Sequence, residues 1–331
     1  MPVDDRFVVR GYRAGDEQAI LELFARSFHA PRPLALWRWK YEDDPWGREH
    51  VSLTLTDDDR ILLGHYAGYS MPFVDGDAEF LAHQVGDTMT DASIRHVGRG
   101  PTSVLGRTAL HFYATFCEGQ VAFNYGFNVA NIQKFSLRFL RSDRVEPVLY
   151  RTIAAERVPP LSRLERYLRG YAFEVVRAAT PEYDELFVRV RGAYGFLVRR
   201  DARYVQWRYL DVPDSPYIVV AVRKRRRLVG WMVYRIRDRR FTWGDALVDP
   251  AESGALFAAL RHIVPRSPVT VVEGWFPSRP QWFSESLERF GFTSAPEPQD
   301  LSLMCVPFTM TDAVAAMRER LYYTWGDSDL F

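Results

Sequence analysis

A weak internal repeat constrains the fold of this chain more than any other feature of its sequence. Residues 37–41, which read Trp-Arg-Trp-Lys-Tyr, have a counterpart at 206–210, and each copy comes before a turn that contains Asp and Pro. Strand-like stretches with a charged turn follow each copy, and the segment 121–140 is echoed by 271–290. Repetition on this scale predicts two related halves that share one architecture.

Hydrophobic spacing predicts the order of elements in the first half. Alternation of apolar and polar residues marks strands, and apolar residues three and four apart mark helices. Read in this way, residues 6–154 predict the order β-α-α-β-β-β-α-β-α-β. The second half predicts a weaker copy of the same order, joined to the first by a helical stretch near 159–170.

Composition excludes several classes of protein. The chain has 331 residues, of which 47% are hydrophobic and 26% charged, as in ordinary globular domains. Its 43 basic residues nearly cancel 42 acidic ones, so a net charge of +1 offers no overall field for nucleic acid or an anionic membrane. The basic run 223–227 falls in a predicted hairpin turn. Solvent-exposed basic side chains are a simpler interpretation of this run than a nucleic-acid contact. We therefore expect neither nucleic acid nor membrane as a partner.

Cysteine usage and the amino terminus indicate a cellular compartment. Cys117 and Cys305 are the only cysteines, and each stands beside apolar residues, which predicts two buried, reduced thiols. The first ten residues lack the apolar core of a signal peptide, and no stretch reaches the roughly 18 apolar residues of a membrane span. The seven histidines form no metal-binding pattern, so no metal is expected. A soluble cytoplasmic protein is the expectation.

A glycine-containing loop is the strongest candidate for a binding site. Arg95, Gly98 and Gly100 stand between a predicted strand and a long predicted helix, and Pro101 suits the first helical position. Glycines let the backbone approach a ligand, and the unpaired N–H groups of a helix start attract anions, so the loop should hold a pyrophosphate. An ordinary glycine turn is the competing interpretation. A P-loop is excluded because no lysine follows the last glycine, and a dinucleotide loop is excluded because three strands and two helices come first.

The loop and its context resemble the GNAT acyltransferases, whose acyl-CoA loop reads Arg/Gln-x-x-Gly-x-Gly/Ala after the fourth strand. Arg95, Gly98 and Gly100 match that pattern, the segment 86–90 leads into it, and the order of elements agrees. The resemblance extends to a tandem type and covers nearly the whole chain. It implies an α+β fold of two fused GNAT-like modules, each a mixed, mostly antiparallel sheet flanked by helices. The boundaries expected are 1–155 for the first module, 156–170 for a helical joint, 171–308 for a degenerate second module, and 309–331 for a C-terminal helix and tail.

The resemblance also implies which residues hold the donor. A backbone N–H near Thr88, Met89 or Thr90 would meet the oxyanion of the reacting thioester. Asn128 or Asn131 would hydrogen-bond the pantetheine arm, although an asparagine at a strand-to-helix junction also serves as a simple cap. The residues expected to bind the acyl-CoA phosphates come from the loop: Arg95, Val97, Gly98, Arg99, Gly100 and Thr102.

The sequence departs from the family where a proton donor is usual. Phe135 stands at the position where many GNAT enzymes have a tyrosine that protonates the leaving thiolate. Tyr125 is therefore the candidate acid, and Asp87 the candidate base. His83 is a further catalytic candidate, with a structural histidine as the alternative. The tail 322–329 combines aromatic residues with two aspartates, which suggests a segment that returns to the protein.

These observations predict an acyl-CoA-dependent N-acyltransferase. Acetyl-CoA or another acyl-CoA would be the co-substrate, and the acceptor would be an amine of a small polar molecule such as an amino sugar. The alternative from another class is a non-catalytic acyl-CoA-binding or protein-interaction module, favoured by Phe135 and by a second half without the loop. An acyl carrier protein as donor stays open, and the oligomeric state is not indicated.

Overall fold

The computed structural model describes residues 7–95 and 97–331, and these divide into two compact units. Arg6, the expected start of the first strand, lies outside the described residues. Unit 1 comprises Met1–Pro72, Phe80–Pro147 and Leu301–Ala315, and unit 2 comprises Phe73–Glu79, Val148–Asp300 and Ala316–Phe331.

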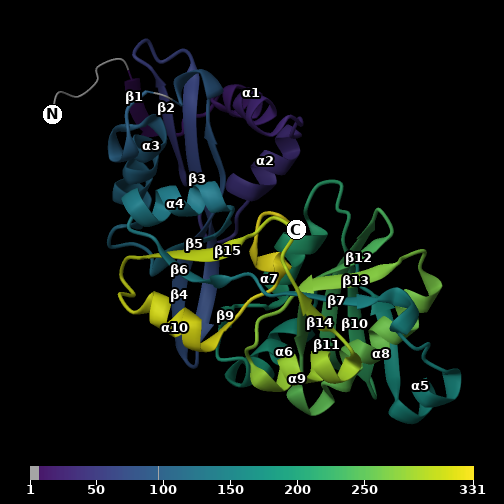
Figure 1. The fold of residues 1–331 in the computed structure, drawn as a ribbon. Coiled ribbons are helices and arrows are strands. Elements are labelled where there is room, and N and C mark those ends of the chain that lie inside the picture. The colour runs from purple at the N-terminus through teal and green to yellow at the C-terminus, as the bar shows by residue number, and fades with distance from the viewer. Residues whose placement is uncertain (1–6, 96) are drawn as a thin grey trace. The chain divides into compact units, whose positions relative to one another are not determined.

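Unit 1 is a mixed sheet with helices packed against it (Figure 1). Its strands follow the order β1-β2-β3-β4-β5-β15-β6, in which β4 and β5 run parallel. The predicted order of elements is confirmed, with one further strand after α4. The bounds are β1 (Phe7–Gly11), α1 (Glu17–Phe28), α2 (Leu34–Tyr41), β2 (Val51–Thr56), β3 (Leu62–Asp75), β4 (Ala78–Thr90), α3 (Val104–Phe112), β5 (Phe123–Asn128), α4 (Ala130–Phe139), β6 (Asp143–Pro147) and β15 (Ser302–Pro307).

Two buried clusters hold unit 1 together. Ile20 and Leu23 of α1 and Trp37 of α2 pack with β2 in one cluster, and Phe112 of α3 packs with Val306 of β15 in the other. The apolar spacing of α1 therefore marks its buried stripe, as the sequence predicts.

Unit 2 repeats this arrangement. Its 7-stranded sheet, among the described residues, has the order β14-β7-β13-β12-β11-β10-β8, with only β12 and β13 parallel. Helix α10 (Ala313–Arg320) begins in unit 1 and ends in unit 2. The other bounds are β7 (Tyr150–Ala154), α5 (Arg163–Arg169), β8 (Tyr171–Val175), α6 (Glu182–Val190), β9 (Phe196–Val198), α7 (Ala202–Val205), β10 (Ile218–Lys224), β11 (Arg227–Arg237), β12 (Arg240–Val248), α8 (Gly254–Ile263), β13 (Val271–Trp275), α9 (Gln281–Phe290), β14 (Thr293–Ala295) and β16 (Leu321–Tyr322).

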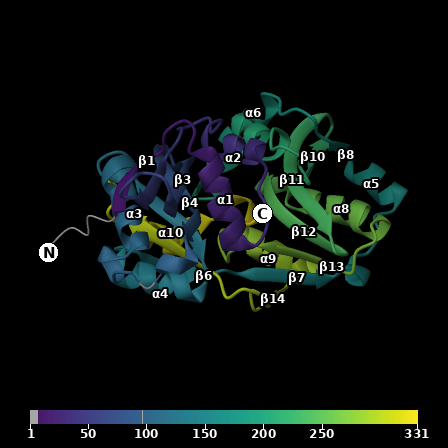
Figure 2. The same cartoon turned by 90° about the horizontal axis from the view of Figure 1, so that it is seen from above.

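Each sheet takes one strand from the far part of the chain. Strand β15 lies between β5 and β6 (Figure 1), and β7 lies between β13 and β14 (Figure 2). In addition, Phe73–Asp75 at the end of β3 pairs with β9, which places that hairpin tip in unit 2. The compact units therefore do not follow the boundaries expected at residues 155 and 308, because hydrophobic periodicity identifies a strand without identifying its sheet.

The repeated aromatic segments serve packing in both units. Trp37 and Tyr41 are each 1% exposed, and Trp207 and Tyr209 are buried as well. The two free cysteines are also buried, as predicted. Within residues 7–95 and 97–331, no helix has the length and apolar character that crossing a bilayer requires.

Candidate functional site

The glycine loop of unit 1 requires its glycines. Gly98 and Gly100 have positive φ angles of 71° and 54°, which side-chain-bearing residues rarely adopt. A Cβ on Gly98 would lie 2.4 Å from the carbonyl oxygen of Thr102, and one on Gly100 would lie 2.7 Å from the ring of Phe139. The loop position His96 lies outside the described residues.

The helix after the loop starts later than the sequence predicts. Pro101 does not take the first position of α3; it lies in a separate 3₁₀ turn, Gly100–Thr102. Ser103 caps α3, with its hydroxyl accepting from the Gly106 amide at 3.1 Å, and this cap fixes the helix start at Val104. The Thr102 hydroxyl donates to the carbonyl of Arg99 at 3.0 Å, so it closes the turn, and Thr102 does not line the cleft beside it.

A cleft of about 700 Å³ opens over this loop. The first N–H groups of α3 have no partner within the helix and the loop contributes two arginines, so the cleft suits an anion. Eight of the residues predicted to bind the donor line it: Thr88, Thr90, Arg95, Val97, Gly98, Arg99, Gly100 and Asn131.

A narrower cavity of about 30 Å³ continues the cleft inward. Four residues line both spaces: Thr88, Leu105, Ile132 and Phe135. The inner cavity also reaches Tyr125, Gly126 and Asn128 on β5. It exists because β4 and β5 pair only at His83–Asn124 and Gln84–Tyr125. The strand ends beyond these pairs form the walls of the inner cavity, so one groove leads from the loop to the strand ends.

A local distortion of β4 separates the residues that line the cleft from those that pack inside. Asp87 has a φ of 51°, and its carbonyl accepts from His65 Nδ1 at 2.7 Å. Beyond it, Thr88 and Thr90 line the cleft, whereas Met89 is 2% exposed and belongs to the buried cluster with α1 and α2. The side chain of Met89 therefore does not line the cleft.

Asp87 lies in a buried ionic cluster and is not suited to be a general base. Arg32 Nη2 lies 2.9 Å from one carboxylate oxygen, and Arg32 Nη1 also contacts the other. Lys40 Nζ at 3.0 Å and the Tyr41 hydroxyl at 2.7 Å donate to that second oxygen. Burial opposes ionisation, but Arg32 and Lys40 lower the pKa of Asp87 well below its usual value. A carboxylate held in this way accepts a proton poorly, so the assignment of Asp87 as base is corrected.

His83 also serves the core. Its ring is 1% exposed, lies 4.5 Å from the ring of His50 between centroids, and contacts Cys117 Sγ at 3.7 Å. Burial and the charge of His50 lower the pKa of His83 to about 3. His83 does not line either part of the cleft, so the structural interpretation replaces the catalytic one.

Tyr125, Asn128 and Asn131 all line the groove. Tyr125 and Asn128 line the inner cavity, and Asn131 lines the outer cleft. The residue at the N-cap of α4 is Val129, whose side chain makes no capping bond. Neither asparagine is therefore occupied as the helix cap. Phe135 lines both spaces and presents a ring, without a hydroxyl, to the groove.

No protein-family model and no curated protein matches the sequence. A GCN5-related N-acetyltransferase from Anabaena variabilis ATCC 29413 is similar in structure, with a TM-score of 0.68 at 13% identity over 91% of this chain and 72% of that one. The chain has the GNAT fold. A second GCN5-related N-acetyltransferase, from Kribbella flavida, gives a TM-score of 0.65 at 14% identity, covering 94% of this chain and 73% of that one.

A further structural neighbour, at lower identity, was solved with an acyl-CoA bound. The N-myristoyltransferase of Saccharomyces cerevisiae, with bound myristoyl-CoA, gives a TM-score of 0.59 at 9% identity. The match covers 93% of this chain and 80% of that one. The structural similarity establishes the fold of this chain. Because the identities are this low, the site has to be argued from the chain's own residues.

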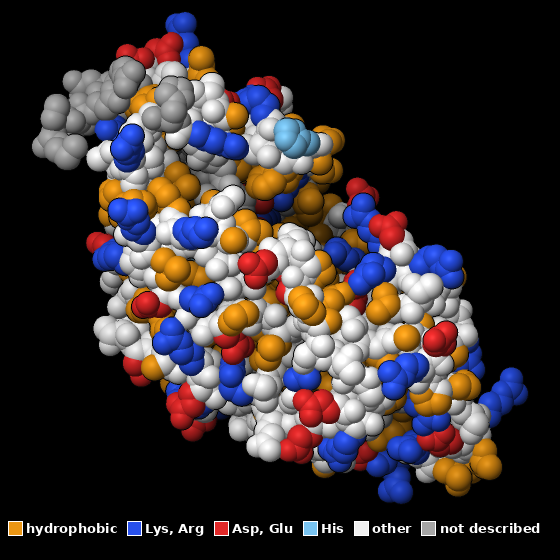
Figure 3. Space-filling model, viewed as in Figure 1, with side chains coloured by type: hydrophobic (Ala, Val, Ile, Leu, Met, Phe, Trp, Pro, Cys, Tyr) orange, Lys and Arg blue, Asp and Glu red, His pale blue; other side chains and the backbone are white. Residues whose placement is uncertain are grey.

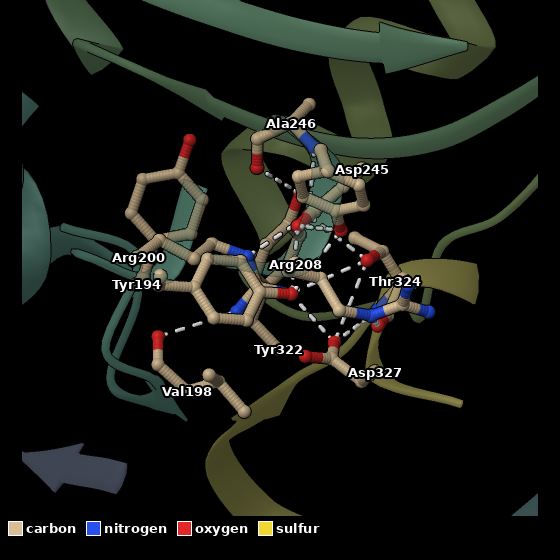
Figure 4. A network of polar contacts seen from close by, with 12 residues as sticks. Tyr194, Val198, Arg200, Arg208, Asp245, Ala246, Tyr322, Thr324 and Asp327 are labelled. Carbon is tan, nitrogen blue, oxygen red and sulfur yellow. Dashed lines mark hydrogen bonds and ion pairs between the residues drawn. The ribbon is translucent and has the colours of Figure 1, made fainter. Parts of the chain in front are cut away.

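The corresponding place in unit 2 of this GNAT fold holds a buried ionic network (Figure 4). Strands β12 and β13 pair as far as Trp243–Gly274, and Asp245 follows. Arg200 donates to Asp245 at 2.9 Å and to Asp327 at 2.6 Å, and Tyr209 donates to Asp245 at 2.7 Å. These side chains are at most 2% exposed in their ion pairs, so the network is part of the core.

The C-terminal tail fills the gap between those strands. Trp325 stacks on Trp275 of β13, with centroids 4.7 Å apart and planes 7° apart. A Cβ on Gly244 of β12 would lie 1.7 Å from the ring of Phe331, so glycine is needed for that close approach. Arg208 donates to the carbonyl of Gly326 at 3.1 Å and fixes the intervening turn. The predicted return of the tail to the protein is confirmed, and its Asp327 is committed to Arg200.

Sequence reasoning missed the partners of Asp87. A signal was present, because Arg32 precedes Tyr41 by nine residues and Arg200 precedes Tyr209 by the same number. Arg32 aligns with Arg200 in the repeat, and the Gly-Asp pairs that end at Asp87 and Asp245 also align. These two alignments together indicate an ionic cluster that both halves share.

Proposed function

We propose that unit 1 is an acyl-CoA-dependent N-acyltransferase that acts on an amine of a small polar acceptor. The observation that carries the proposal is the groove that runs from the Gly98 loop to the strand ends at Thr88 and Asn128. The fold of the neighbouring N-acetyltransferases supports it.

Each part of the groove suits one part of the donor. Arg95, Arg99 and the start of α3 offer cationic and N–H donors for a pyrophosphate. Asn128 stands where an amide-rich pantetheine arm would pass along the edge of β5. The thioester would then reach the inner cavity near Thr88, where a backbone amide at the distorted end of β4 would donate to the oxyanion.

The chemistry requires little proton transfer from side chains. The amine nitrogen attacks the thioester carbonyl, the C–N bond forms, and the C–S bond breaks. A thiol with a pKa near 8.5 leaves tolerably well as thiolate, and Tyr125 lies close enough to the inner cavity to protonate it. Among the described residues that line the two spaces there is no Asp, Glu or His. The amine therefore enters as the free base and loses its proton to water after attack.

The inner cavity favours a short acyl group. At about 30 Å³ it is far smaller than the outer cleft of about 700 Å³, so a small acyl group such as acetyl is the expected cargo. The walls that set this limit include Tyr66, Tyr113 and Phe135.

A non-catalytic acyl-CoA-binding module is the second candidate. Phe135 in place of a hydroxyl-bearing residue, and a cleft lining without carboxylate or imidazole, both favour it. Such a protein would bind acyl-CoA in the same groove and release no thiol with any amine.

Calorimetric titration with acetyl-CoA, followed by a thiol-release assay against a panel of amines, separates these functions. We expect binding, and thiol release with at least one amino sugar or related amine. The double variant Arg95→Glu and Arg99→Glu should weaken binding at least about 10-fold, because two cations beside the phosphates become anions. The matched control, Arg13→Glu and Arg60→Glu, changes exposed arginines that pair with Asp59 and Asp58 and should leave binding unchanged. Binding without thiol release would select the second candidate, and no binding would overturn both.

A further inference from the structure

One face of unit 2 combines exposed apolar side chains with unpaired cations. We name it the α5 face and define it by Arg163, Leu164, Arg166, Tyr167, Leu168 and Arg225. Leu164, Tyr167 and Leu168 are 68%, 82% and 73% exposed. In Figure 3, orange and blue side chains lie together at the lower right, where Figure 1 labels α5. Neighbouring large apolar side chains this exposed mark a surface that meets a partner.

A basic pocket lies beside these apolar side chains. It has a volume of about 530 Å³ and is lined by Arg163, Arg166, Tyr167, Gly170, Tyr171 and Arg225. No acidic residue belongs to this lining, and within the described part of the chain none of the three arginines forms an ion pair. Three guanidinium groups around one hollow fit the oxygens of a phosphate.

Two acidic residues beside this face, one on α5 and one bonded to Tyr171 of the pocket, are already paired with cations. Glu165 accepts from Arg169 at 3.0 Å and from Arg261 at 2.6 Å. Glu252 accepts from Lys224 at 2.6 Å and from the Tyr171 hydroxyl at 2.8 Å. The α5 face therefore presents a local excess of positive charge, which a net charge of +1 over the whole chain conceals.

The backbone keeps this face in place. Ser162 caps α5 by accepting from the Glu165 amide at 3.1 Å, and Arg261 also donates to the carbonyls of Pro159 and Pro160. At the turn between β10 and β11, Arg225 and Arg226 adopt φ angles of 48° and 73°, where Asn or Gly would cost less.

We propose that the α5 face docks unit 2 on an anionic lipid membrane. The arginines would hold lipid phosphates, and Leu164, Tyr167 and Leu168 would enter the boundary between headgroups and acyl chains. Exposed leucines next to arginines favour this partner over nucleic acid, whose backbone offers phosphates but no apolar surface to meet them. The inference is independent of the acyltransferase activity, because every residue of the face belongs to unit 2.

Vesicle co-sedimentation tests the proposal. The full chain is mixed with vesicles of phosphatidylcholine alone or of phosphatidylcholine with phosphatidylglycerol, and we expect it to bind only the second kind. The triple variant Arg163→Glu, Arg166→Glu and Arg225→Glu should lower the partition coefficient about 100-fold or more. The variant Leu164→Ser, Tyr167→Ser and Leu168→Ser should lower it about 10-fold or more, and because these side chains are exposed the fold should persist.

The matched control reverses exposed arginines elsewhere. Arg60→Glu, Arg237→Glu and Arg239→Glu give the same change of net charge, and the last two lie at the turn at the opposite end of β11. This control should bind the anionic vesicles like the unaltered chain. Equal binding to both kinds of vesicle, no binding to either, or a control that loses as much as the α5 variant would overturn the proposal. Binding of a synthetic RNA duplex in place of vesicles would overturn it as well.

Discussion

The two units build the same ionic cluster and use the space beside it differently. In unit 1, Asp87 is held by Arg32 and Tyr41, and in unit 2 Asp245 is held by Arg200 and Tyr209. In both, the carboxylate follows a glycine just beyond the last residue pair between the parallel strands.

What lies in the gap between those strands distinguishes the units. In unit 1 the strand ends line a cavity that joins the glycine-loop cleft, whereas in unit 2 Trp325 and Phe331 of the tail occupy the gap. Unit 2 also lacks the loop: Asp249 caps the turn before α8 and pairs with Arg189.

Comparing the two units distinguishes residues that stabilise the fold from residues that carry the proposed acyl transfer. Because unit 2 keeps the Asp245 cluster without an open donor groove, that cluster does not by itself indicate catalysis. Asp87 in unit 1 is best understood in the same way, as a group that fixes the distorted end of β4. The features found only in unit 1 are the loop glycines and the open gap, and these carry the proposed function.

The largest expected effect concerns the arginine of each cluster. Arg200→Ala should lower the free energy of unfolding by about 3 to 5 kcal/mol, since it leaves Asp245 and Asp327 buried without their cation. Arg32→Ala should cost about 1 to 3 kcal/mol, because Asp87 keeps Lys40 and Tyr41. Denaturant unfolding followed by tryptophan fluorescence measures both changes. An equal loss of unfolding free energy in the two variants would contradict the difference drawn here between the clusters.

The next effect concerns the loop that only unit 1 has. Gly98→Asp should weaken acetyl-CoA binding by about 100-fold or more, because it adds a carboxylate at the phosphates and a Cβ against Thr102. Gly119→Asp is the matched control, with a φ of 72° and no atom within 4 Å of its Cβ. Calorimetric titration measures both affinities. Unchanged affinity in the first variant would remove the loop from the site.

A smaller effect should mark the tail of unit 2. Burial raises the pKa of Asp327 to about 6, although Arg200 opposes the rise. A carboxyl whose pKa is higher folded than unfolded stabilises the protein at low pH, and that contribution is lost as pH rises from about 4 to 6. Relative to Asp327→Asn, the unaltered chain should therefore lose on the order of 1 kcal/mol per pH unit across that window. Measuring the free energy of unfolding of both proteins at several pH values checks this. Two curves of free energy against pH that run parallel would contradict it.

The smallest effect should come from restoring the missing tyrosine. Phe135→Tyr should change kcat by less than about 10-fold, whereas a site that lacked an essential acid would gain about 100-fold or more. Tyr125→Phe provides the comparison, since Tyr125 lines the inner cavity and is the candidate acid. Steady-state kinetics of thiol release measures both. A large gain in the first variant would show that proton donation limits the unaltered chain.

Local features of this chain could be predicted from the sequence, but pairings at long range could not. The order of elements and the Gly98 loop follow from short-range spacing and from what glycine permits. The exchange of β7 and β15 between the sheets does not follow from short-range spacing. The sequence of a five- or six-residue strand does not indicate which sheet the strand joins. The residues that line the two spaces divide in the same way: local patterns predict the loop and Asn128, whereas the distortion at Asp87 decides which of Thr88 and Met89 faces the cleft.

The number of CoA molecules bound per chain tests the central claim most directly. Native mass spectrometry of the full chain with excess acetyl-CoA should show one bound molecule, because unit 1 has the loop and open groove and the tail fills the corresponding gap of unit 2. The same measurement on Gly98→Asp should show none. Two molecules per chain, or one that persists in Gly98→Asp, would contradict the account.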